Sequence, residues 1–191
     1  MFTLSLGHAQ VVLKEWQAEN DVLTLWQVHS SKVHVLESPI QGLEGDAIIT
    51  TTKGLKIGVR TADCVPVALL GKKTVAVVHA GWRGLKAHIV EKTVEKLAGF
   101  EPLEHFLAFV GPSAKACCYQ VGEEFKEHFL SVHYKNAKHY MDTQEEALLR
   151  LKASGIKNFY VYKVCTICHH RFPSYRKDRT QRRLLTFAEL L

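Results

Sequence analysis

The sequence predicts an α+β fold, because its first half consists mainly of strand-like segments and its second half mixes helices with strands. Strands are predicted from apolar runs rich in β-branched residues, and helices from apolar residues that recur at the helical period. With 47% hydrophobic and 23% charged residues, the chain of 191 residues can bury a core of its own. It has no internal repeat or Gly/Ser linker, so we expect residues 1–191 to form a single domain.

The predicted strands differ in pattern. Residues 22–29 alternate and end on His29, whereas residues 74–80 are apolar almost throughout and indicate a buried strand. Two strands flank the pair Asp63-Cys64. The full set of predicted strands spans residues 22–29, 45–51, 56–62, 65–70, 74–80, 105–112 and 158–164.

Three segments are predicted to be helices. They span residues 84–100, 122–134 and 142–155. The first has apolar residues at the helical period and reaches a stop signal at Gly99. For the third, Asp142 is the predicted N-cap, with Glu145 at the capping-box position.

Composition excludes several classes of protein. No apolar run approaches the length of a membrane span, and the N-terminal residues lack the basic segment and cleavage site of a secretion signal. We therefore expect a cytoplasmic protein that is not bound to a membrane. Five cysteines, without the spacing of a disulfide framework, predict reduced thiols.

A basic run near the C-terminus contributes to the net charge of +6. Its cationic residues are Arg171, Arg176, Lys177, Arg179, Arg182 and Arg183. Such a run is most often a solvated surface, and nucleic-acid binding is not favoured because aromatic residues are sparse and no recognition motif occurs. A third interpretation is that one or two of the arginines bind a small anion such as phosphate.

Three potential metal ligands occur at one kind of position, the end of a buried strand. These are His29, Cys64 and His79. Imidazole and thiolate are preferred zinc donors, and a site with three protein ligands leaves a coordination position for water or substrate. A buried His or Cys is more often a packing residue, so sequence spacing leaves both interpretations open.

The segment Gly81-Trp82-Arg83-Gly84 joins a predicted strand to a predicted helix. A helix N-terminus with Arg83 beside it would suit an anion, although the Gly-Lys-Ser/Thr ending of a Walker A loop is absent. The alternatives are ordinary ones: Trp82 as a core or rim aromatic, Arg83 as a surface charge, and the glycines as a turn.

The other four cysteines form an adjacent pair, Cys117 and Cys118, and a C-x-x-C pair, Cys165 and Cys168. Together they suggest a structural zinc site. We instead expect free thiols at Cys165 and Cys168, because neighbouring thiols rarely point the same way and no second C-x-x-C exists.

Six motifs occur in the order found in one protein family: WQVHSSKV, GDAIIT, TADCVPV, VHAGWRGL, GPSAKACCYQVG and FPSYRKD. Between about residues 26 and 182, the chain resembles the YfiH family, the laccase-domain or polyphenol oxidase family now regarded as purine nucleoside phosphorylases. The resemblance implies a zinc site formed by His29, Cys64 and His79. It also implies a layered αββα sandwich with mixed sheets, related to bacterial toxin deamidases.

The activities implied by the resemblance are phosphorolysis of adenosine, inosine and methylthioadenosine and hydrolytic deamination of adenosine, with purine nucleosides and phosphate as partners. Cys64 and His79 would then be catalytic as well as metal-binding. Arg83 and Arg176 are the candidates for holding phosphate.

Asp46 or Asp63 would orient ligands or act as a base, although turn or capping roles suit both aspartates equally well. The family usually has a longer N-terminal segment with a T-R-x-G-G-x-S stretch. Only 28 residues precede His29 here, and no Gly-Gly pair occurs, so we expect a shortened N-terminus.

Three other functions compete with this interpretation. A copper polyphenol oxidase, with copper in place of zinc, is disfavoured because none of the eleven histidines forms a His-x-His pair. A cysteine hydrolase, such as an amidase acting on a cell-wall precursor, would use Cys64 as nucleophile and His79 as base. A basic nucleic-acid or partner-binding module with a degenerate site is the third, and the shortened N-terminus is its support.

Overall fold

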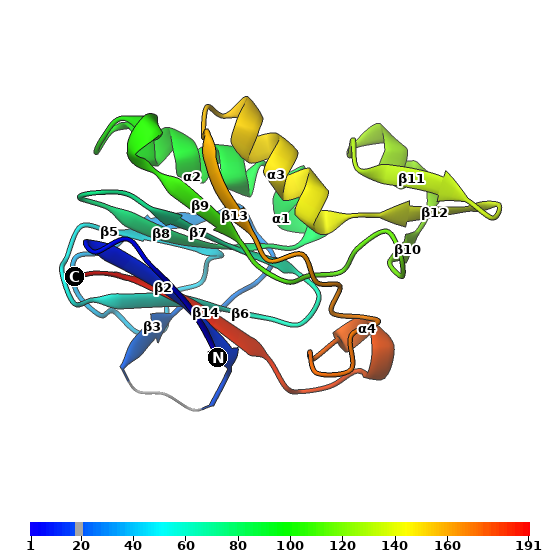
Figure 1. Ribbon diagram of the computed structural model, residues 1–191, viewed down its shortest axis with the longest axis horizontal. Coiled ribbons are helices and arrows are strands. Elements are labelled where there is room, and N and C mark those ends of the chain that lie inside the picture. The colour runs from blue at the N-terminus through cyan, green and yellow to red at the C-terminus, as the bar shows by residue number, and fades with distance from the viewer. Residues whose placement is uncertain (18–20) are drawn as a thin grey trace.

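The computed structural model describes residues 1–17 and 21–191 and shows two packed mixed β-sheets with helices on one side (Figure 1). In order of pairing, the five-stranded sheet contains β1 (Phe2–Ser5), β2 (Ala9–Glu15), β14 (Leu184–Leu190), β6 (Lys56–Thr61) and β3 (Val22–Thr24). The six-stranded sheet contains β13 (Asn158–Val161), β9 (Leu107–Val110), β7 (Val65–Leu70), β8 (Val75–Ala80), β5 (Ala47–Thr50) and β4 (Val33–Val35).

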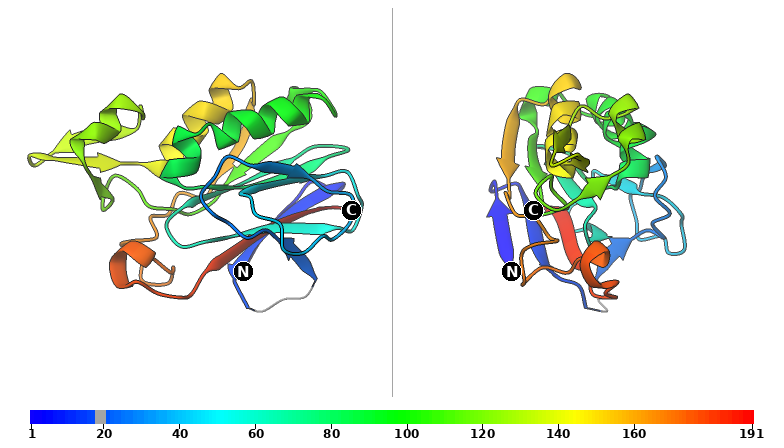
Figure 2. Two further views of the ribbon diagram at one scale, coloured as in Figure 1. Left: turned by 180° about the vertical axis from the view of Figure 1, so that it is seen from behind. Right: turned by 90° about the vertical axis from the view of Figure 1, so that its right-hand side faces the viewer.

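The helices gather on the outer face of the six-stranded sheet, as Figures 1 and 2 show. These helices are α1 (Trp82–Lys86), α2 (Ile89–Ala98) and α3 (Thr143–Ala153), whereas the single turn α4 (Tyr175–Asp178) lies apart from them, near the start of β14. Two short 3-10 turns are η1 (Leu103–His105) and η2 (Glu123–Glu127). The predicted α+β class with mixed sheets is confirmed.

The two faces of β7 and β8 pack against different layers. Val67 and Val78 belong to the core between the sheet and the helices, whereas Ala68 and Val77 belong to the core between the two sheets. Because successive strand residues point to opposite faces, burial on both faces requires apolar residues at every position. This explains the nearly continuous apolar runs in residues 65–70 and 74–80.

Two predicted helices differ from the structure. The helix expected over residues 84–100 is interrupted at His88, whose φ of 64° is left-handed, so that α1 and α2 are separate. The prediction of a helix over residues 122–134 is wrong. The first part of this segment is the turn η2, and its last part is β11 (Val132–Lys135).

A small sheet of β10 (Gln120–Val121), β12 (Lys138–Met141) and β11 takes the place of that helix. Phe125 and Phe129 pack against the core from this region, with the Phe125 ring centroid 5.2 Å from that of Trp82. Backbone pairing with β12 then determines the conformation of β11.

Other predictions were closer. Asp142 caps α3 as predicted, since its side chain accepts a hydrogen bond from Glu145 N at 3.0 Å. The Glu145 carboxylate contacts His133 at 2.7 Å.

The strand expected over residues 22–29 is shorter and ends at Thr24, and β1, β2 and β14 were not predicted. No helix in residues 1–17 and 21–191 is long and apolar enough to cross a membrane.

The turn of the β7–β8 hairpin is held by a buried carboxylate. Glu101, 6% exposed, accepts hydrogen bonds from the backbone N–H groups of Lys72 and Lys73 at 3.0 and 2.9 Å. This contact fixes the end of the hairpin opposite to Cys64 and His79.

We predict that Glu101→Ala lowers the free energy of unfolding by about 1–3 kcal/mol, because two turn N–H groups lose their acceptor. Chemical denaturation measures the change. The matched control is Glu95→Ala on the exposed face of α2, which should stay within about 0.5 kcal/mol of the parent protein. Equal effects of the two substitutions would contradict the role of Glu101.

Candidate metal centre

The structure brings His29, Cys64 and His79 together, with their potential ligand atoms all within 4.8 Å of one another. His79 is buried near the end of β8, Cys64 precedes β7 and is half-buried, and His29 is exposed in the loop after β3. The two imidazole rings lie 4.8 Å apart between centroids, at an interplanar angle of 68°. Three segments distant in sequence therefore meet at one site.

The register of the β7–β8 hairpin accounts for part of this convergence. Val65 pairs with Ala80, so Cys64 lies opposite Gly81. A Cβ on Gly81 would lie 2.8 Å from Cys64 Sγ and 3.1 Å from His29 Cδ2, which is too close for a side chain. The donors thus occupy the space that any other residue at position 81 would fill.

Gly84 plays a similar part on α1. A Cβ there would lie 3.1 Å from the carbonyl oxygen of Ser30, the residue after His29. The two glycines of the Gly-Trp-Arg-Gly segment therefore let α1 approach the His29 loop closely.

A buried aspartate orients both histidines. Asp46 is fully buried, and its Oδ1 accepts hydrogen bonds from His79 Nδ1 at 2.8 Å and from His29 N at 3.0 Å. Its Oδ2 accepts from Ser30 N at 2.6 Å and Ser30 Oγ at 2.7 Å. With Nδ1 bonded to a carboxylate, His79 keeps Nε2 for a metal or a substrate, as in carboxylate–histidine–zinc arrangements.

One candidate ligand, His29, and the residue before another, Asp63, adopt unusual backbone conformations. His29 has a φ of 59° and Asp63, next to Cys64, has a φ of 91°. Residues other than glycine rarely adopt such values, and they persist where surrounding contacts impose them, commonly at functional sites. Here the contacts are Asp46 with the His29 amide, and a hydrogen bond from Ala114 N to the Asp63 carbonyl at 2.8 Å.

Charge favours the ionised form of Cys64. Burial opposes ionisation, but the charge of His79 and hydrogen bonds from His29 and His79 lower the pKa of Cys64 from 9.0 to about 6. Burial also disfavours the His79 imidazolium, yet the thiolate and Asp46 raise the pKa of His79 from 6.5 to about 9. Burial raises the pKa of Asp46, but hydrogen bonds from His79 and Ser30 lower it below its ordinary value.

The residues present fit a transition-metal ion. A thiolate and two imidazoles are preferred zinc donors, and zinc at 2.0–2.3 Å from each would hold them about 3.3–3.8 Å apart. The observed limit of 4.8 Å requires only a small contraction. The same three donor types also bind copper, so the ligand set by itself does not define the metal.

The predicted phosphate residues differ in their surroundings. Arg176 is exposed at the start of α4, where its backbone N–H donates to Asp63 Oδ2 at 2.7 Å. Its guanidinium donates to the Gln120 carbonyl at 3.0 Å and lies 4.7 Å from the centre of the Tyr119 ring. Because Asp63 precedes Cys64, Arg176 is linked to the metal centre through one residue.

Arg83 is also exposed, two residues after Gly81, and its guanidinium lies 4.4 Å from the centre of the Trp82 ring. Trp82 packs against the core beside the helices, as a rim aromatic does. Elsewhere in the basic run, Arg182 pairs with Glu15 at 2.6 Å. The sequence analysis did not identify Ser30 or Tyr119 as residues of the site. The one sequence signal that could have identified them is their position next to His29 and Cys118.

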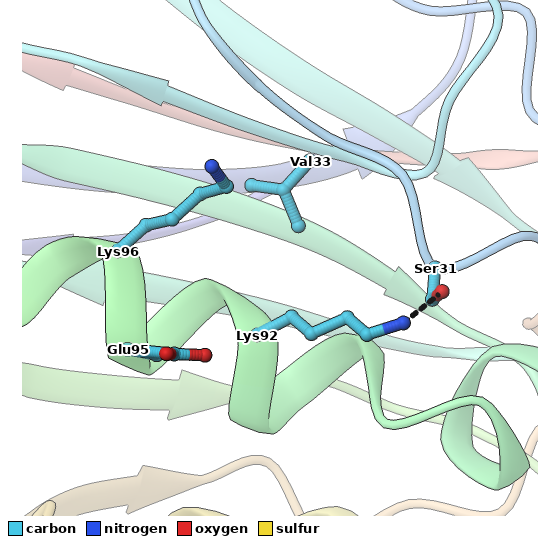
Figure 3. A pocket seen from close by; sticks show the side chains of 5 residues that line it. All are labelled: Ser31, Val33, Lys92, Glu95 and Lys96. Atoms are coloured by element: carbon cyan, nitrogen blue, oxygen red, sulfur yellow. Dashed lines mark hydrogen bonds between the residues drawn. The ribbon is translucent and has the colours of Figure 1, made fainter.

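Helix α2 supports the His29 loop from the other side. Lys92 Nζ donates to Ser31 Oγ at 2.7 Å across a surface pocket of about 290 Å³ that Val33, Glu95 and Lys96 also line (Figure 3). None of the three candidate ligands lines this pocket. Its contribution to the site is to tie the loop after His29 to α2.

The fold and the three donors define an α+β protein with a His–Cys–His centre at one end of a β-hairpin. Over residues 8–190 the sequence matches the family described as multi-copper polyphenol oxidoreductase laccase. It is 45% identical over 190 residues to a purine nucleoside phosphorylase of Aquifex aeolicus, covering 98% of this chain and 92% of that protein.

Adenosine deaminase RL5, from an unknown prokaryotic organism, is 31% identical over 176 residues, covering 79% of this chain and 67% of its own length. The crystal structure of the hypothetical protein YfiH of Bacillus licheniformis shares the fold, with a TM-score of 0.81 at 24% identity. That match covers 90% of this chain and 74% of the YfiH chain. The chain therefore belongs to the laccase-like YfiH family, as its motifs predicted.

We predict that Gly81→Ala weakens zinc binding about tenfold or more, because the new methyl group must displace Cys64 Sγ and the His29 ring. Competition with a chromophoric chelator measures the affinity. Gly99→Ala at the end of α2 is the control, since its Cβ would meet only the Lys96 carbonyl, at 3.3 Å. Unchanged zinc affinity in Gly81→Ala would show that the ligand cluster does not need this close approach.

Proposed function

We propose that the protein is a zinc-dependent purine nucleoside phosphorylase acting on adenosine, inosine or methylthioadenosine, with adenosine deamination as a second reaction. The observation that carries the proposal is the His29–Cys64–His79 cluster oriented by Asp46, with Arg176 linked to it through Asp63. The purine nucleoside phosphorylase and adenosine deaminase among its relatives support the choice of substrate.

Phosphorolysis breaks the bond between the purine nitrogen and the anomeric carbon of the ribose. A phosphate oxygen forms the new bond to that carbon, and the base leaves with a proton, giving ribose 1-phosphate. The chain must hold the phosphate and supply the proton. Arg176, already placed by Gln120 and Tyr119, offers a guanidinium group whose planar fork matches phosphate. Arg83 is the second candidate, at the start of α1.

Deamination uses water in place of phosphate and releases ammonia from the adenine ring. A zinc ion bound at the cluster would act as a Lewis acid that lowers the pKa of water. Asp46 fixes the orientation of the His79 ring in both reactions. With zinc bound, His79 would be a ligand through Nε2 while its Nδ1–H donates to Asp46, so the raised pKa of His79 applies to the metal-free centre alone.

We predict different effects for two substitutions. His79→Ala should remove both activities together with most of the bound zinc, because two donors bind the ion poorly. Arg176→Ala should raise the KM for phosphate about 10- to 100-fold, as expected when a charged hydrogen-bond donor is lost. It should leave zinc content and deamination unchanged, because the contact with Asp63 comes from the backbone N–H.

The matched control is Lys177→Ala, which removes a positive charge from the neighbouring exposed position of α4. Products are identified by chromatography of adenosine reactions with and without phosphate, and zinc by elemental analysis. Equal loss of both reactions in Arg176→Ala, with zinc retained, would contradict the phosphate role. Turnover by the copper-loaded but not the zinc-loaded protein would contradict the choice of metal.

A second candidate function is a cysteine hydrolase, and the ionisation of Cys64 favours it. A thiolate beside a protonated histidine, itself oriented by an aspartate, is the arrangement of an activated cysteine nucleophile. Cys64, His79 and Asp46 would then act in the order nucleophile, base and orienting residue. Such an enzyme works without metal, which separates it from the phosphorylase.

We predict that chelation abolishes nucleoside turnover and that zinc restores it. In the metal-free protein, iodoacetamide should alkylate Cys64 at a rate that falls about tenfold per pH unit below about pH 6, because only the thiolate reacts. Peptide mass spectrometry locates the modified residue, and added zinc should protect it. Amide hydrolysis that survives chelation and is lost on alkylation would favour the hydrolase.

A further inference from the structure

Four of the five cysteines converge at a second place in the fold. Cys117 and Cys118 lie in the turn before β10, and Cys165 and Cys168 lie in the turn after β13. Their sulfur atoms all lie within 4.8 Å of one another. The two segments run side by side in Figure 1, and a parallel bridge joins Ser113 to Cys165.

The separations suit one tetrahedral ion. Zinc–sulfur bonds of about 2.3 Å place the corners of a ZnS₄ tetrahedron about 3.8 Å apart. Cys117 Sγ and Cys168 Sγ are 3.8 Å apart, which is far longer than a disulfide bond, and all five cysteines are free thiols. The sequence argument against a metal site assumed that adjacent thiols point apart. For Cys117 and Cys118 that assumption is wrong.

Backbone contacts hold the ligand turns in place. Thr166 N donates to the Ser113 carbonyl at 3.0 Å, and Cys118 N donates to the Lys115 carbonyl at 3.0 Å. The two turns that carry the four cysteines are therefore held by main-chain hydrogen bonds within the fold.

We propose that Cys117, Cys118, Cys165 and Cys168 bind one structural Zn²⁺ ion. Four thiolates close the coordination sphere, which is the arrangement of structural rather than catalytic zinc, and soft sulfur ligands favour zinc among the common divalent cations. This centre shares no ligand with the His29–Cys64–His79 cluster.

The second centre would brace the rim of the first. Thr166, between the two C-x-x-C cysteines, donates from Oγ1 to Asp63 Oδ1 at 2.7 Å. Tyr119, next to Cys118, carries the guanidinium of Arg176 over its ring. An ion that joins the two turns would thereby fix the positions of Asp63, Tyr119 and Arg176 relative to one another. This positioning role rests on the proposed phosphorylase function, whereas zinc binding itself does not.

The test is metal analysis of the purified protein, its Cys165→Ser/Cys168→Ser variant and its His29→Ala/His79→Ala variant. We expect about two zinc ions per chain in the parent protein and about one in each variant. Cys64→Ser is the matched control for loss of a thiol, since it should leave the four-cysteine centre loaded. A zinc content unchanged by Cys165→Ser/Cys168→Ser, or disulfides among these cysteines found by mass spectrometry, would overturn the proposal.

Cobalt titration of the His29→Ala/His79→Ala variant provides a second measurement that does not depend on the folding of the cysteine variant. A tetrahedral four-thiolate site should give strong sulfur-to-cobalt charge-transfer absorption that zinc displaces. Absence of that absorption, or bound iron in place of zinc in the parent protein, would also overturn the proposal.

Kinetics separate this proposal from the proposed function. If the centre positions Arg176, Cys165→Ser/Cys168→Ser should raise the KM for phosphate while deamination remains. If this variant loses one zinc ion but its KM for phosphate does not change, the result supports zinc binding at the four cysteines and contradicts the positioning role. Absence of nucleoside turnover in the parent protein, with two zinc ions bound, would contradict the phosphorylase and leave the second centre intact.

Discussion

The candidate metal centre depends on the buried carboxylate of Asp46. This side chain is fully buried and accepts four hydrogen bonds, which offset the cost of removing its charge from water. The backbone of Asp46 is tied to the same place, because His79 N donates to its carbonyl at 2.7 Å. One residue therefore determines the position of the His29 loop and the orientation of the His79 ring.

Close packing around Gly81 also positions the candidate ligands. The β7–β8 register places Cys64 opposite Gly81, and the missing side chain of Gly81 leaves the volume into which the sulfur and the His29 ring extend. The left-handed backbone of His29 and the positive φ of Asp63 cost free energy, and the contacts around them maintain both conformations. Ligand geometry is thus imposed by the surrounding fold rather than by local preference.

Asp63 connects the two metal centres that we propose. One of its carboxylate oxygens accepts from Thr166, within the C-x-x-C turn, and the other accepts from the backbone of Arg176. The next residue, Cys64, is a proposed ligand of the first centre. A structural ion at the four cysteines would therefore affect catalysis through position and not through chemistry, by holding Asp63 and the proposed phosphate ligand Arg176 in place.

Sequence alone determined the α+β class, the strands of the β7–β8 hairpin, the cap of α3 and the family, because local periodicity, capping and contiguous motifs carry that information. It failed over residues 122–134, where pairing with β12 outweighs helical periodicity. Sequence also named His29, Cys64 and His79 but left Asp46 with two roles and set the four other cysteines apart as unpaired thiols. Only the tertiary structure decided those points, because donor distances depend on strand register and on turns brought together from distant parts of the chain.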